Sequence, residues 1–370
     1  MAALHMLPAP TRCVRLACLC LLLAAVLPSC RAQEVESGLG PLPVFEFHSG
    51  FWVNLHHFLY HEARARAAAR NARSDGSKAA GPVLKSAPGS ASPLSAAEQN
   101  IWDRAIAYYS AEYAQKDLTV NLDLVLLKNQ LGDFEDCNEL TGKKKRSCDA
   151  GLPGEVGPIL EAAAPVYRAH WWPDHDRANR RWVIRMAPLV REQGVGLSQR
   201  LADIYQTNWP KDKIRVEVCA FANGAGAYTT LDPLRVTISS TDPRNQGMEA
   251  LEVLFHEASH DIARPVETAI TRECKQRDKP IPRNLWHALI FYTTGEVLRP
   301  ITKDSPPEKG GGDAAPPPKA KPNLVPYELS DLLSQRGWEE YHLLLVLYWQ
   351  PYLDGKVSFE DAIAHLVSAV

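Results

Sequence analysis

The sequence predicts an α+β protein in which a small antiparallel β-sheet lies beside a mainly helical body. Two observations lead to this prediction. Apolar residues recur at three- and four-residue spacings over most of the chain, as they do on one face of a helix. The period changes to two at residues 214–219 and 235–238, where β-branched and polar residues alternate, and the turn sequence 223–226 lies between them. Residues 227–231 are a candidate third strand at the edge of the sheet.

The composition is that of a folded globular protein. Of 370 residues, 45% are hydrophobic and 23% are charged, which suffices for one large or two ordinary cores and excludes wholesale disorder. Lys and Arg together number 41 against 43 Asp and Glu, so no basic excess indicates a nucleic-acid partner. After the first 32 residues, no apolar run approaches the roughly 18 residues that a transmembrane helix needs.

Residues 1–32 are typical of a secretory signal peptide. Two arginines precede an apolar run at 16–27, and residues 30–32 form a small-x-small cleavage pattern. We therefore expect an exported protein, periplasmic or secreted, whose mature chain begins near Gln33. The alternative is a lipid anchor at Cys30, because the four residues that end there loosely match a bacterial lipobox.

Four cysteines lie beyond the signal peptide, namely Cys137, Cys148, Cys219 and Cys274. An even number in an exported chain favours disulfides over thiolate metal ligands, although four cysteines allow three pairings. Proximity favours a bond between Cys137 and Cys148, and Cys219 would then pair with Cys274. Four buried free thiols are the alternative.

Two segments poor in large apolar side chains divide the mature chain. Residues 64–97 are dominated by Ala, Arg, Ser, Gly and Pro, and residues 302–323 contain six prolines and three glycines. Neither can bury enough surface to offset the entropy of ordering. The predicted parts are an N-terminal His-rich and aromatic segment (33–63), a linker (64–97), a central body (98–301), a Pro/Gly-rich loop (302–323) and a C-terminal helical segment (324–370).

The chemistry is concentrated in an HExxH sequence, in which His256, Glu257 and His260 lie on a helix expected at 246–263. Histidines four residues apart share a helix face and can reach one metal ion, while Glu257 can approach a water on that metal. Because the neighbouring residues are apolar, unpartnered imidazoles there would each cost roughly 1–3 kcal/mol. The pattern therefore predicts a catalytic Zn²⁺ site with a third protein ligand and an open position for water.

Residues 214–300, with this motif at their centre, resemble the gluzincin group of zinc metallopeptidases, of which thermolysin is the familiar member. No individual family within the group is indicated. The resemblance implies a zincin-like catalytic core and a His₂Glu zinc site that hydrolyses peptide bonds in peptide or protein substrates by Glu-assisted attack of zinc-bound water. Asp261 departs from the group's pattern, since the position after the second histidine is ordinarily uncharged; it either supports a ligand or faces water.

Glu296 is our choice for the third ligand, because it lies on a separate helix expected between the prolines at 282 and 300. At about 100° per residue, His287 on the same helix should point about 180° away from Glu296, and we exclude it for that reason. Two other carboxylates are rivals, although Pro265 separates both from the motif: Glu267 and Glu273. A metzincin site is excluded because Val266 occupies the position of its third histidine.

Gluzincins also donate a hydrogen bond to the oxyanion from a downstream Tyr or His. The candidates are Tyr341 and His342, with Tyr292 behind them. The alternative for all three is an ordinary place in the core or on the surface of a Leu-rich helix.

The sequence thus predicts an exported zinc-dependent peptidase. Two other functions remain open: a non-catalytic exported binding protein that keeps a structural zinc helix, and a zinc hydrolase acting on a non-peptide amide. Glu257 discriminates between catalysis and structure, because a structural zinc has no use for a base at that position.

Overall fold

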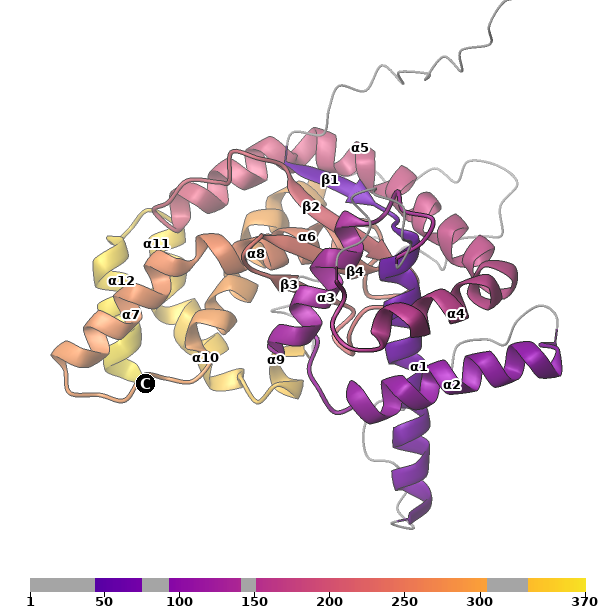
Figure 1. The fold of residues 1–370 in the computed structure, drawn as a ribbon. Helices are drawn as coiled ribbons and strands as arrows, with labels where there is room; N and C mark the ends of the chain where they lie inside the picture. The colour runs from indigo at the N-terminus through magenta and orange to yellow at the C-terminus, as the bar shows by residue number, and fades with distance from the viewer. Residues whose placement is uncertain (1–43, 75–92, 141–150, 305–331) are drawn as a thin grey trace, which may run out of the picture. The chain divides into compact units, whose positions relative to one another are not determined.

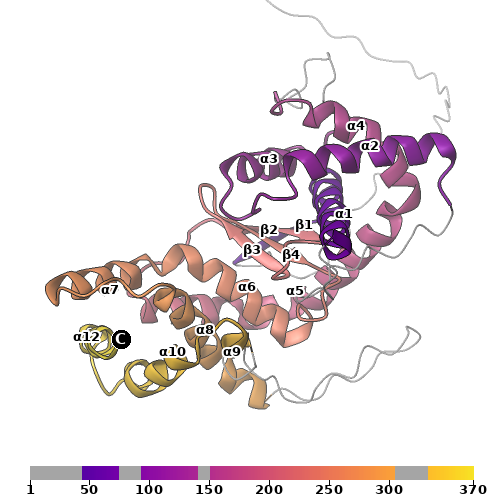
Figure 2. The same cartoon turned by 90° about the horizontal axis from the view of Figure 1, so that it is seen from below.

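The computed structural model describes residues 44–74, 93–140, 151–304 and 332–370. Residues from Pro41 to Val370 form one compact unit, and the predicted signal peptide, with Cys30, lies outside the described residues. The α+β prediction is confirmed, because a small sheet lies between two layers of helices (Figures 1 and 2). The helices are α1 (Phe51–Ser74), α2 (Ala96–Glu112), α3 (Leu122–Asp133), α4 (Val156–His170), α5 (Trp172–Ile204), α6 (Gly247–Ile262), α7 (Arg264–Gln276), α8 (Leu285–Asp304), α9 (Leu332–Gln335), α10 (Glu339–Leu344), a π-helical turn η2 (Leu345–Trp349), α11 (Gln350–Leu353) and α12 (Phe359–Ala369).

The described sheet is mixed, so the prediction of an antiparallel sheet is wrong. Its order is β1-β2-β4-β3, with β1 (Phe45–His48), β2 (Ile214–Cys219), β3 (Ala227–Thr230) and β4 (Arg235–Ser239). β2 pairs in parallel with both β1 and β4, whereas β3 pairs antiparallel with β4. The turn at 223–226 leads into β3, and the chain then reverses once more before β4. β4 consequently runs in the direction of β2.

Alternate residues of β2 belong to two different cores, one on each face of the sheet. Val216 and Val218 belong to a core shared with α5 and α6 on one face. Cys219, at a position of opposite parity, belongs to the core around α1, α2 and α4 on the other face. The sheet therefore separates two apolar cores, and each helical layer closes one of them (Figure 2).

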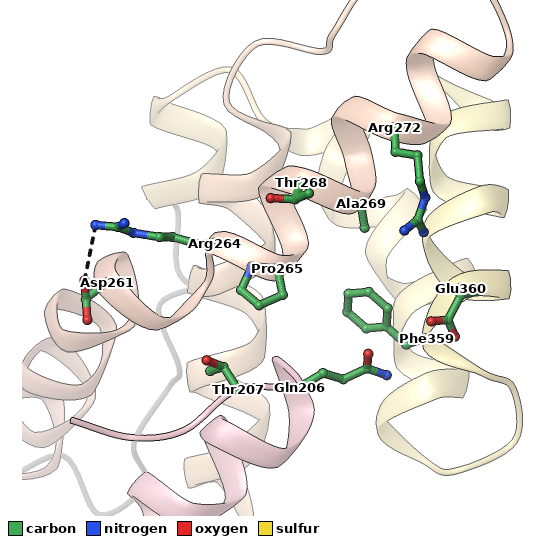
Figure 3. A pocket seen from close by; sticks show the side chains of 10 residues that line it. All are labelled: Gln206, Thr207, Asp261, Arg264, Pro265, Thr268, Ala269, Arg272, Phe359 and Glu360. Atoms are coloured by element: carbon green, nitrogen blue, oxygen red, sulfur yellow. Dashed lines mark ion pairs between the residues drawn. The ribbon is translucent and has the colours of Figure 1, made fainter. Parts of the chain in front are cut away.

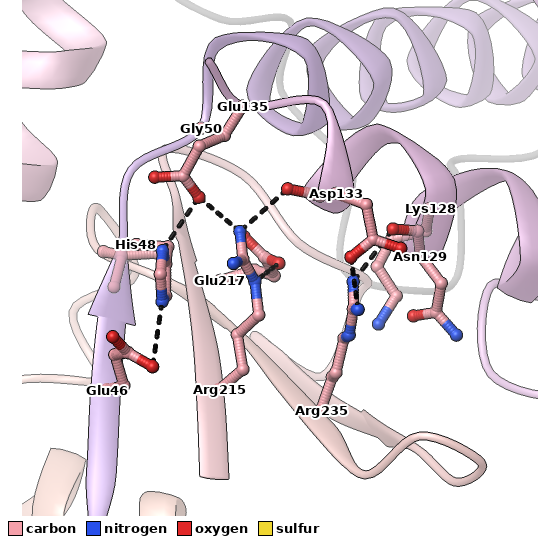
Figure 4. A network of polar contacts seen from close by, with 12 residues as sticks. Glu46, His48, Gly50, Lys128, Asn129, Asp133, Glu135, Arg215, Glu217 and Arg235 are labelled. Carbon is pink, nitrogen blue, oxygen red and sulfur yellow. Dashed lines mark hydrogen bonds and ion pairs between the residues drawn. The ribbon is translucent and has the colours of Figure 1, made fainter. Parts of the chain in front are cut away.

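The face of the sheet toward α3 also buries a polar network (Figure 4). Arg215 donates to Glu217 at 2.6 Å and to the carbonyl of Gly132 at 2.9 Å, and Arg235 donates to the carbonyl of Asn129 at 2.8 Å. A Cβ at Gly132 would lie only 2.6 Å from a Glu217 oxygen. The glycine thus lets α3 approach closely enough for its carbonyls to satisfy buried guanidinium groups, which would otherwise be costly.

The segments that flank the central body are part of the same unit. β1 extends the sheet beside β2, and α1 runs through the core of the α2–α4 layer. Residues 64–74 of the expected linker are the continuation of α1, while 75–92 lie outside the described residues. Residues 305–331, which include most of the expected Pro/Gly-rich loop, also lie outside them. None of the described helices has both the length and the apolar character for crossing a membrane.

Cys219 and Cys274 are separate, buried free thiols, so the predicted bond between them is wrong. The sheet explains this outcome, since Cys219 lies in the core on the α1 side and Cys274 on α7 lies in the core on the α6 side. Cys148 lies outside the described residues, and its bond with Cys137 stays a prediction.

Candidate metal centre

The HExxH sequence lies in the middle of α6, on the helix that covers one face of the sheet. Leu251, Leu254 and Phe255 bury the apolar stripe of α6 in the core below the strands. This packing leaves His256 and His260 on a common face, with ring centroids 5.1 Å apart. The predicted helix and its paired histidines are therefore present.

The third histidine at this centre comes from α8, which packs against α6. The Nε2 atoms of His287 and His256 are 3.3 Å apart, and the rings of His287 and His260 are 4.9 Å apart. One ring nitrogen from each of the three residues lies within 4.8 Å of the others. His256, His260 and His287 thus form a cluster that could hold a metal ion.

Glu296, our choice for the third ligand, is not brought to this cluster. Its carboxylate instead forms an ion pair with Arg299, one turn along α8. His287 and Glu296 lie in different surroundings on α8, as their nine-residue separation predicts. The prediction was wrong about which face of α8 meets α6, because that face carries His287 and not Glu296.

Three imidazole nitrogens could hold a metal ion. The 3.3 Å between the His256 and His287 nitrogens is close to the roughly 3.3–3.4 Å that separates two nitrogens bound at about 2.0–2.1 Å to a tetrahedral Zn²⁺, and the three nitrogens together lie within 4.8 Å of one another. Burial lowers the pKa of His256 well below its usual value, that of His260 to about 4 and that of His287 to about 3. All three imidazoles are therefore neutral at pH 7, as metal ligands must be.

Aromatic rings fix the orientation of the three imidazoles. Phe291 stacks on His256 with centroids 3.7 Å apart, and Trp286 stacks on His287 at 5.1 Å. Trp338 lies edge-on to His287 at 5.3 Å, and Trp286 lies edge-on to His260 at 5.5 Å. Side chains packed in this way cannot turn freely, so the cluster is largely preorganised for a ligand.

An arginine from the C-terminal segment adds positive charge to this environment. The Arg336 guanidinium lies 4.9 Å from the centroid of Phe291 and 5.1 Å from that of Trp338. Its charge contributes, after burial, to the low pKa values of the three histidines. Nothing in the sequence near Arg336 marks it as part of the centre, because its position depends on how α9 and α10 return to α8.

Glu257 is held beside the histidines by the edge strand. The Thr229 hydroxyl on β3 lies 2.7 Å from Glu257 Oε2 and 2.8 Å from the Glu257 carbonyl oxygen. Glu257 Oε2 is also 3.9 Å from His260 Nε2. Burial raises the pKa of Glu257 to about 7, while the hydrogen bond from Thr229 and the charge of Arg336 lower it. The carboxyl group is therefore buried beside the histidines and held there by Thr229.

The candidate oxyanion donors make other contacts. Tyr292 donates to Gln350 at 2.7 Å, and Tyr341 donates to the carbonyl of Arg283 at 2.9 Å. His342 packs against the Tyr292 ring at 5.9 Å. The structure therefore gives each of these three side chains a structural contact, and none of the three belongs to the group of described residues that could hold a metal ion.

The rival carboxylates are also directed elsewhere. Glu273 pairs with Arg277 and Arg272 on its own helix, and the half-buried Glu267 is not part of the histidine cluster. Both lie on α7, which begins after a break in the helix at Ala263 and has Pro265 in its first turn.

Asp261, the departure from the gluzincin pattern, is not part of the histidine cluster. Its carboxylate lies 3.6 Å from Arg264 and lines a cavity of about 610 Å³ between α5, α7 and α12 (Figure 3). Arg272, Thr268 and Glu360 line the same cavity, and none of the three histidines does. This cavity is therefore separate from the candidate metal centre.

Comparisons with known proteins add no relative to this picture. Protein-family models, curated proteins and solved structures each gave no match to the chain. The assignment of a function therefore depends on the geometry and chemistry of the residues described above.

Proposed function

We propose that this chain is an exported zinc-dependent peptidase in which His256, His260 and His287 hold the metal and Glu257 is the general base. The convergence of three imidazoles from α6 and α8, next to a carboxyl group, is the observation that carries the proposal. Export rests on the signal-like sequence of residues 1–32, with a lipid anchor at Cys30 as its alternative form.

In the proposed reaction, each residue of the centre has a separate role. Zinc, when bound, supplies a water whose pKa is lowered to about 7 and an electrophile for a carbonyl oxygen. Glu257 accepts a proton from the attacking water and returns it to the leaving amine, which is the usual work of a general acid–base carboxylate. The Thr229 hydroxyl keeps Glu257 oriented toward the cluster during both transfers.

The arrangement around α6 supports a zincin-like core. A mixed sheet packs on the HExxH helix, and its antiparallel edge strand, β3, runs beside that helix and contacts Glu257. In the described part of the chain β3 pairs with β4 along one side only. We propose that an extended peptide substrate adds to the other side of β3, which would hold its carbonyl groups near the metal.

Glu257→Gln tests the proposal, with Glu267→Gln as a matched carboxylate control outside the cluster. Elemental analysis should find about one zinc per chain in the wild-type protein and in both variants. Hydrolysis of a peptide mixture should fall by about 10²- to 10⁴-fold in Glu257→Gln, as expected for loss of a general base, and should be unchanged in Glu267→Gln.

Equal hydrolysis by the wild-type protein and Glu257→Gln would refute the mechanism. A wild-type protein that holds zinc and cleaves nothing would favour the non-catalytic binding protein. Cleavage confined to non-peptide amides would favour a zinc hydrolase of such amides, with the same residues in the same roles.

A further inference from the structure

A cleft of about 310 Å³ adjoins the candidate metal centre on the side of β3. One wall is formed by Thr229 of the edge strand and by Leu231 just after it, and His260 also lines the cleft. The opposite wall is the start of α3 and the turn before it, with Val120, Leu122 and Val125. The volume is at the lower end of the range for ligand pockets, about 300–1,000 Å³, so it suits part of a peptide rather than a large ligand.

The cleft is apolar away from the strand, and its apolar side chains are unusually exposed. Val120 is 81% exposed and Leu122 is 67% exposed, and Leu231 on the facing wall is 38% exposed. Two further threonines complete the lining, so no lining residue carries a carboxylate or an ammonium group. Exposed apolar side chains grouped around a concave site commonly indicate a binding surface.

The turn that presents these side chains is held in place by its own polar residues. Asn121 caps α3 by accepting a hydrogen bond from the backbone N–H of Leu124 at 3.2 Å. Asp117 accepts one from the backbone N–H of Thr119 at 2.7 Å. The apolar wall of the cleft is therefore fixed before any ligand arrives, which reduces the entropy lost on binding.

A purely structural role does not account for Val120. A residue just before the N-cap often packs against the fifth position after it, here Val125, and so stabilises the start of a helix. Val120 instead leaves most of its surface in solvent. Leu126, one turn beyond Leu122 on α3, is 51% exposed but does not line the cleft, which makes it a matched control.

We infer that this cleft selects peptides with a large apolar residue next to the bond that is cleaved, and that Val120, Leu122 and Leu231 contact that side chain. The inference rests on the proposed peptidase function. His260 belongs to both the metal cluster and the cleft. A substrate side chain bound in the cleft would therefore belong to a residue next to the bond that is cleaved. Thr229 and its neighbours on β3 provide the backbone partners, and α3 provides the apolar contact.

The test compares the wild-type protein with Val120→Asp and with Leu126→Asp. Cleavage sites in a mixed peptide library, mapped by mass spectrometry, should be enriched in Leu, Ile, Val, Met or Phe on one side of the bond. Val120→Asp should lower kcat/KM for an apolar peptide by at least tenfold and reduce that enrichment, and Leu126→Asp should change neither by more than about twofold. Both positions are exposed, so neither substitution should disturb the fold.

Binding to the zinc-loaded Glu257→Gln variant separates this inference from the proposed function. A fluorescent peptide with an apolar central residue should bind more tightly than a matched peptide with Ser at that position, and Val120→Asp should remove the difference. Cleavage without apolar enrichment, or equal effects of Val120→Asp and Leu126→Asp, would overturn the inference and leave the peptidase proposal standing. Equal binding of the two peptides would overturn it even if no cleavage were seen.

Discussion

Replacing His287 with Ala should weaken zinc binding by about two to three orders of magnitude. Structural zinc sites with four protein ligands contribute about 10–16 kcal/mol in total, or roughly 2.5–4 kcal/mol per ligand, and about 1.4 kcal/mol corresponds to a tenfold change in affinity. His287 provides one of three converging nitrogens, with Nε2 3.3 Å from that of His256. Loss of its ring should therefore remove about one ligand's share of the affinity.

Glu296→Gln is the matched control, because Glu296 lies on the same helix but pairs with Arg299. Competition with a chromogenic chelator at fixed pH gives the zinc affinity of each protein, and circular dichroism of the metal-free forms confirms that each is folded. Glu296→Gln should bind zinc within about twofold of the wild type. If Glu296→Gln lost affinity to the extent predicted for His287→Ala, or if His287→Ala bound zinc normally, the three-histidine centre would be wrong.

Two further predictions concern buried groups away from the metal. Burial lowers the pKa of Lys128 to about 7, so between pH 7 and 10.5 the unfolded chain binds a proton that the folded chain does not. The free energy of unfolding should therefore rise with pH across that window by on the order of 5 kcal/mol, and urea titrations should show the rise in the surface variant Lys116→Met but not in Lys128→Met. Cys219 and Cys274 should resist alkylation in the native protein and react in denaturant without reductant, as seen by mass spectrometry; protection of both after unfolding would show that they are bonded.

The sequence identified those parts of the site that depend on local spacing. His256, Glu257 and His260 follow from a single helical turn, and the helix that carries them is present within a residue or two of its predicted ends. Thr229 and His287 depend on which face of one element meets another across the core. For His287 the periodicity limited the choice to two opposite faces of α8, and tertiary packing, which periodicity does not encode, selected between them.

The errors in the fold have a similar origin. β1 is only four residues long, and the alternation of Phe45, Glu46, Phe47 and His48 is too short to distinguish a strand from the start of a helix, yet β1 completes one edge of the sheet. The parallel pairing of β2 with β4 could not be inferred because the turn after β2 leads to β3 instead. The alternation within β2 did predict that its two faces differ, and this difference determines which core contains Cys219.

β3, the edge strand beside the candidate metal centre, is held by hydrogen bonds to the helices on both faces of the sheet. Thr229 bonds Glu257 of α6, and the next residue, Thr230, accepts a hydrogen bond at 2.6 Å from the fully buried Lys128 of α3. A shift of β3 by one residue against β4 would move each threonine hydroxyl to the opposite face of the sheet. The two hydrogen bonds therefore fix the register of β3. An exposed edge strand ordinarily favours aggregation, because other chains can pair with its free backbone groups. Because the register of β3 is fixed, a peptide that paired with it would do so at one defined alignment, without displacing β3.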